Sequence, residues 1–121
     1  MAEDNDLNAE IATMLLEDEG MNVTRAVDGC EVVEMFKNHP AGTFDVILMD
    51  IMMPRMNGYE ATKTIRELSD RPDGARIPII AMTANAFAED VVKCKEAGMD
   101  SHLPKPFKAD QLIASIVAPK N

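Results

Sequence analysis

The sequence is poor in the residues that mark several classes of protein. It contains no Trp, one Tyr and four Phe, and only two of its 121 residues are Cys. Cys30 and Cys94 are far apart and match no metal-binding or redox spacing, which favours reduced thiols over a disulfide or a zinc site. No apolar run approaches the roughly 18 residues of a membrane span, and residues 1–6 do not resemble a signal peptide. These absences favour a cytoplasmic protein without membrane contact.

Basic residues are also scarce. The chain has 12 Lys and Arg against 21 Asp and Glu, which gives a formal net charge of -9. Nucleic acid is therefore not expected as a direct partner, because phosphate backbones are bound by clusters of Lys and Arg. The remaining composition is that of one globular domain large enough to bury its own core.

The apolar pattern predicts helices that alternate with strands. Helices are expected from Asn5 or Asp6 to Gly20, from Asp28 to before Pro40, and over residues 59–68, 87–97 and 112–117; strands are expected over residues 22–27, 44–49, 77–82 and 102–103. Residues 44–49 and 77–82 are almost continuously apolar, as in parallel strands that are buried on both faces. The alternation predicts an α/β protein with a doubly wound parallel sheet and helices on both faces.

Polar side chains follow the predicted strands. Asp50 ends one buried strand, Thr83 ends the next, and Lys105 follows the last, while Glu3 and Asp4 stand where a preceding strand would end. Because the carboxyl ends of parallel strands meet at one edge of a sheet, we expect these five side chains to gather there.

This set of side chains suits phosphoryl chemistry. Glu3, Asp4 and Asp50 would repel one another unless a cation joined them, and ligands that are all oxygen favour Mg²⁺. The Thr83 hydroxyl and the Lys105 ammonium would bind the oxygens of a phosphoryl group. Asp50 is the candidate nucleophile, which would form an acyl phosphate, because the apolar strand before it fixes its position.

Other interpretations of these residues are weaker. Taken singly, an Asp after a strand is usually a cap or turn residue. A calcium loop that begins at Asp4 would need glycine where Ala9 stands and glutamate where Leu15 stands. A phosphatase of the haloacid dehalogenase type would need a second aspartate where Met52 stands.

The sequence resembles the receiver domains of two-component signalling. The resemblance is carried by residues 2–5 (AEDN), 45–54 (DVILMDIMMP), 56–58 (MNG), 78–84 (PIIAMTA), 97–100 (AGMD) and 105–107 (KPF). These stretches have the order and spacing of that family and cover nearly the whole chain. The resemblance implies a flavodoxin-like fold, and the style of the motifs is most like the receivers of hybrid histidine kinases.

The resemblance also implies roles for the acidic residues. Asp50 would accept a phosphoryl group from a histidine kinase or a histidine phosphotransfer domain. Asp4, Asp50 and the backbone carbonyl of Met52 would bind Mg²⁺, with Glu3 acting through a water. An isolated domain of this kind phosphorylates and dephosphorylates itself but is not an enzyme with a separate substrate.

Thr83 and Lys105 would contact the phosphoryl oxygens in such a domain. Thr83 and a ring at the position of His102 would couple phosphorylation to a change of the surface formed by the fourth helix, the last strand and the last helix. A degenerate receiver that only binds partners is the alternative, and the presence of every required side chain argues against it.

One part of the family pattern is missing. Receivers begin with an apolar interior strand, which residues 1–121 lack, so we expect an N-terminally incomplete receiver domain. Losing about five buried apolar residues would cost on the order of 8 to 15 kcal/mol, as much as a whole domain's stability. We therefore expect a trimmed chain, a rearranged sheet, or a homodimer or strand exchange that supplies the strand. In the last two cases Glu3 and Asp4 would be poorly anchored.

Overall fold

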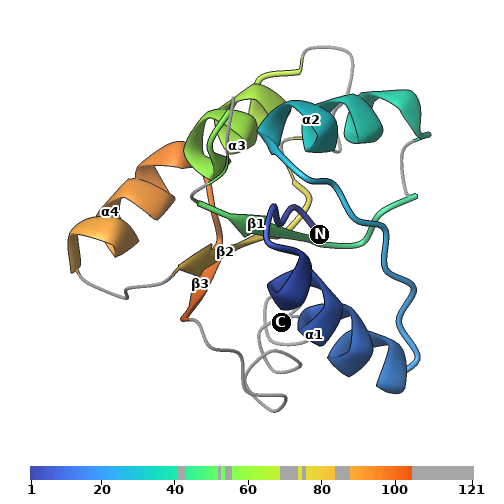
Figure 1. Cartoon of the computed structure of the whole chain (residues 1–121). Coiled ribbons are helices and arrows are strands. Elements are labelled where there is room, and N and C mark those ends of the chain that lie inside the picture. The colour runs from blue at the N-terminus through green and yellow to red at the C-terminus, as the bar shows by residue number, and fades with distance from the viewer. Residues whose placement is uncertain are drawn as a thin grey trace.

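The computed structural model describes residues 1–40, 43–51, 53, 56–68, 74, 76–83 and 88–104. The elements in this part of the chain are α1 (Asp6–Asp18), α2 (Gly29–Asn38), β1 (Ile47–Asp50), α3 (Gly58–Arg66), β2 (Ile79–Thr83), α4 (Ala88–Ala97) and β3 (Ser101–Pro104) (Figure 1). The predicted helix over residues 112–117 lies outside the described residues. None of the helices in the described ranges is both long and apolar enough to cross a bilayer.

The helices begin and end at the residues that the local sequence favours. Asn5, rather than Asp6, caps α1, since its side chain accepts a hydrogen bond from the N–H of Asn8 at 3.0 Å. Asp28 caps α2 in the same way. Gly20, with φ +83°, follows the end of α1, in the left-handed conformation that glycine adopts without strain.

The three strands form a parallel sheet in the order β1-β2-β3. In Figure 1, α2 and α3 cover one face of the sheet and α1 lies on the other. Successive strand residues alternate between two buried clusters: Ile47, Met49, Ile79 and Ala81 pack with residues of α2, α3 and α4, whereas Leu48, Ile80, Met82 and Leu103 pack with Leu16 of α1. The continuous apolar runs arise because both faces are buried, which confirms the predicted doubly wound sheet.

Residues 1–3 occupy a further strand position, here called a lane, beside β1 in this sheet. Ala2 forms parallel bridges with both Ala26 and Met49. The N–H of Ala2 donates to Leu48 at 2.8 Å, and its carbonyl accepts from the N–H of Asp50 at 2.9 Å. Numbered along the chain, the lanes lie in the order 2-1-3-4-5, which is the flavodoxin-like order.

The position of residues 1–3 corrects the expectation of a rearranged sheet with a poorly anchored acidic pair, and it also bears on the strand expected over residues 22–27. The sheet is not rearranged, and the backbone N–H of Glu3 is held by the carbonyl of Ala26 at 3.0 Å, so the acidic pair is anchored. The predicted strand over residues 22–27 is reduced in the structure to a single bridge, between Ala26 and Ala2.

The helix α1 packs against the sheet mainly through alanines. Ala9, Ala12 and Leu16 are its buried residues. Its large apolar residues Leu7, Ile11 and Met14 are 65%, 42% and 59% exposed. The apolar spacing therefore predicted the helix correctly, although most of the large residues that create this spacing point to solvent.

Candidate functional site

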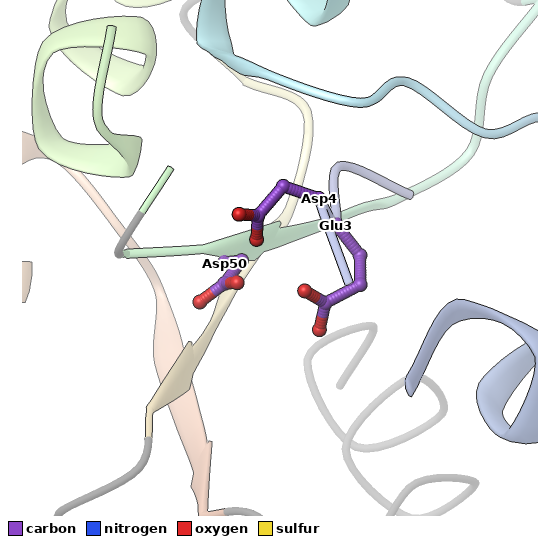
Figure 2. Close-up of side chains that lie close together, drawn as sticks. All are labelled: Glu3, Asp4 and Asp50. Atoms are coloured by element: carbon purple, nitrogen blue, oxygen red, sulfur yellow. The ribbon is translucent and has the colours of Figure 1, made fainter. Parts of the chain in front are cut away.

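The end of β1 and the start of the chain bring three carboxylates together. Asp50 is the last residue of β1, and its side chain is buried, as is that of Glu3, while Asp4 is exposed. Their carboxylate oxygens include one from each residue that all lie within 4.8 Å of one another. Figure 2 shows the three side chains converging from the first lane and from β1. The cluster is the one expected from the sequence.

The donor set of this cluster fits a hard divalent cation. All three groups offer oxygen, with no His or Cys in the cluster, which favours Mg²⁺ over zinc or copper. Carboxylates this close repel one another, and a bound cation relieves the repulsion. Because Asp4 is exposed, the cluster is open to solvent on one side, and an ion there could keep the several waters that Mg²⁺ retains in proteins.

A glycine brings the start of α3 against Asp50. The N–H of Gly58 donates to the carbonyl of Ile51 at 2.9 Å. A Cβ at Gly58 would overlap the carbonyl oxygen of Asp50 and lie 3.0 Å from the Ile51 Cα. The sequence interpretation placed Gly58 just before the helix expected over residues 59–68 and missed this role, although the Asn-Gly pair before a helix is a signal for it.

Arg25 is a second residue that the sequence interpretation missed. Its Nε and Nη2 donate to the backbone carbonyl of Glu3 at 3.0 and 2.9 Å. Its Nη1 lies 2.9 Å from Oδ1 of Asp6, the first residue of α1. No signal in the sequence distinguished this arginine from any other polar residue of the expected strand.

The remaining predicted residues are placed less completely. Thr83 ends β2, the strand beside β1, and pairs in register with Pro104 at the end of β3, so its backbone lies at the predicted edge. The Thr83 side chain, Met52 and Lys105 lie outside the described residues. His102 is an exposed residue of β3.

Comparison with known proteins agrees with this architecture. The response regulator receiver domain family matches residues 1–117. The chain is 38% identical over 112 residues to the peroxide stress-activated histidine kinase mak1 of Schizosaccharomyces pombe, covering 93% of this chain and 7% of that protein. It is 40% identical over 118 residues to hybrid signal transduction histidine kinase I of Dictyostelium discoideum, covering 96% of this chain and 7% of that protein. The chain thus spans less than a tenth of the length of both kinases.

Solved structures show the same similarity. The receiver domain of sensor histidine kinase PA1611 from Pseudomonas aeruginosa, with a magnesium ion coordinated in its active site cleft, is 38% identical, with a TM-score of 0.83 over 95% of this chain and 89% of that one. Chemotaxis protein CheY4 of Vibrio cholerae is 29% identical, with a TM-score of 0.85 over 95% of this chain and 91% of that one. The chain belongs to the response regulator receiver domain family of two-component signalling.

Proposed function

We propose that Asp50 is the phosphoacceptor of this receiver domain and that residues 1–121 all belong to this one domain. The observation that carries the proposal is the convergence of Glu3, Asp4 and Asp50 at the end of β1, with oxygens within 4.8 Å of one another. Asp4, Asp50 and the Met52 carbonyl would hold Mg²⁺, with Glu3 acting through a water. When bound, the ion neutralises the charge on the phosphoryl oxygens.

The reaction is a transfer between two side chains. An Asp50 carboxylate oxygen attacks the phosphorus of a phosphohistidine; a P–O bond forms, the P–N bond breaks, and the imidazole nitrogen keeps the electron pair. The Thr83 hydroxyl and the Lys105 ammonium bind the phosphoryl oxygens. Water later attacks the phosphorus and returns Asp50 and inorganic phosphate, so the domain consumes only its own phosphoryl group.

The signal would leave the site through a surface change. The Thr83 backbone ends β2 and lies in register with the end of β3, the strand that carries His102. A rearrangement of Thr83 around the phosphoryl group would alter the position of His102 and the surface of α4 and β3. Because His102 is exposed, a partner protein can read that change.

The phosphoryl donor would be a histidine kinase or a histidine phosphotransfer domain that docks on α1. Leu7, Ile11 and Met14 follow one another at i, i+4 and i+7 on that helix and are exposed, so they form one apolar stripe. The helix begins two residues after Asp4, so the stripe starts, at Leu7, three residues after that member of the acidic cluster. The similarity to hybrid histidine kinases supports a relay role for Asp50. A cytoplasmic location is part of the same proposal.

The homodimer or strand exchange expected from the sequence stays a prediction. A monomeric mass in size-exclusion chromatography with light scattering at high protein concentration would contradict it.

The phosphoacceptor proposal is tested with small phosphodonors. Acetyl phosphate with Mg²⁺ should add one phosphoryl group to the intact mass, and Asp50→Asn should abolish the adduct. Asp45→Asn is the matched control, because this carboxylate precedes the amino end of β1 and should leave phosphorylation unchanged. No adduct on the unaltered protein would refute the proposal, and rapid turnover of p-nitrophenyl phosphate would indicate a phosphatase instead.

A further inference from the structure

Arg25 joins the two ends of the acidic turn at the start of the chain. Its guanidinium contacts the Glu3 carbonyl through two nitrogens, at 3.0 and 2.9 Å, and Asp6 through the third, at 2.9 Å. The Glu3 carbonyl belongs to the peptide group that links Glu3 to Asp4. A single side chain from the neighbouring lane therefore restrains the backbone between the two carboxylates.

The two contacts of Arg25 differ in how much they contribute to holding the backbone. The Asp6 side chain is 93% exposed and that of Arg25 is 29% exposed, so their ion pair is well solvated and contributes little. The bonds to the Glu3 carbonyl are partly buried, and they come from a charged, planar donor with fixed geometry. The pair of hydrogen bonds to the Glu3 carbonyl, called the grip below, is thus the contact that fixes the local backbone.

The charge of Arg25 and its hydrogen bonds to the Glu3 carbonyl should have opposite effects on the affinity of the site for Mg²⁺. A positive side chain beside an acidic cluster repels Mg²⁺, so on charge alone its removal would tighten binding. If the grip on the Glu3 carbonyl keeps the Glu3 and Asp4 side chains directed at Asp50, its removal would weaken binding. The sign of the change therefore distinguishes the two effects.

We propose that Arg25 is a positioning residue for the metal site, which holds the Glu3-Asp4 peptide so that both carboxylates face Asp50. This inference rests on the proposed magnesium-dependent function. It adds to that function a group that touches neither the ion nor the phosphoryl group. Groups that orient metal ligands typically change metal affinity by about 10 to 100-fold when they are replaced.

The test is a calorimetric titration with Mg²⁺ at fixed ionic strength. Arg25→Met keeps the aliphatic stem and removes the guanidinium, and its dissociation constant should rise on the order of 10-fold. Arg25→Lys keeps the charge but loses the forked grip, so it should also bind Mg²⁺ more weakly than the unaltered protein. Asp6→Asn, the control, leaves the grip on the Glu3 carbonyl in place and should change the affinity less than either.

A second measurement needs no metal. In amide NMR spectra of the metal-free protein, Arg25→Met should shift the Asp4 and Asn5 signals and speed their hydrogen exchange, while Ile80 in the sheet stays protected. Equal or tighter Mg²⁺ binding by Arg25→Met, or unchanged Asp4 and Asn5 signals, would refute this inference alone. Absence of Mg²⁺ binding by the unaltered protein would refute the proposed function, and this inference with it.

Discussion

Replacing Gly58 by alanine should damage the site through a single added methyl group. The Cβ would overlap the carbonyl oxygen of Asp50 and lie 3.0 Å from both the Asp50 carbonyl carbon and the Ile51 Cα, whereas ordinary contacts begin at 3.4 Å. All three atoms belong to the backbone of β1 and its end, so no flexible side chain can move aside. Either the start of α3 or the end of β1 must shift, and with it Asp50.

The size of this effect follows from the overlap. Overpacking by a single methyl group costs about 1 to 3 kcal/mol, and backbone obstacles favour the upper end of that range. Against a typical domain stability of roughly 5 to 15 kcal/mol, the protein should remain folded. A displacement of Asp50 approaching 1 Å should slow its phosphorylation by on the order of 10 to 100-fold, because in-line attack depends on position.

Two assays on two variants distinguish an effect on phosphorylation from an effect on stability. Urea unfolding followed by far-UV circular dichroism measures stability, and intact mass after timed exposure to acetyl phosphate measures phosphorylation. Gly20→Ala is the control: with φ +83° and no atom within 4 Å of its Cβ, it should lose about 1 to 2 kcal/mol through backbone strain alone. Gly20→Ala should phosphorylate normally. A Gly58→Ala protein with unchanged stability and phosphorylation rate would refute the reasoning.

Two further predictions concern stability. Arg66 donates to three backbone carbonyls at 2.7–3.0 Å and to the Asp100 carboxylate at 2.9 Å, so Arg66→Met should lower the free energy of unfolding by about 2 to 4 kcal/mol in urea titrations. Mg²⁺ affinity should not change, because these contacts lie at the amino ends of β2 and β3. Burial lowers the pKa of the Met1 α-amino group from 8.0 to about 6, so the unfolded chain binds that proton more tightly. Stability should therefore rise between pH 6 and 8, by at most about 3 kcal/mol, and N-terminal acetylation should remove this rise.

The predictions that succeeded depend on local chemistry and on general rules of sheets. Residues 44–49 and 77–82 are apolar at nearly every position, which is typical of strands buried on both faces. Asp50 and Thr83 follow these two predicted strands, and they were expected at one edge of the sheet because parallel strands run in the same direction. The start of α1 was predicted at Asn5 or Asp6 and that of α2 at Asp28, since a capping side chain bonds within its own first helical turn; the structure uses Asn5 and Asp28.

The predictions that failed or were missed depend on neighbours distant in sequence. Residues 22–27 have the composition of a strand, yet pairing there needs a partner lane, and only Ala2 bridges to Ala26. The buried face of α1 is set by how closely the helix approaches the sheet, which favours Ala9 and Ala12 over larger residues.

By itself, the sequence determined the alternating elements, the doubly wound sheet and the three carboxylates of the site, because each of these follows from side-chain periodicity and strand direction. Only the tertiary structure decided how the carboxylates are held. The grip of Arg25 on Glu3 spans 22 positions, and Gly58 meets Asp50 across a loop. Such contacts arise when the chain closes on itself, and no periodic pattern in the residues encodes them.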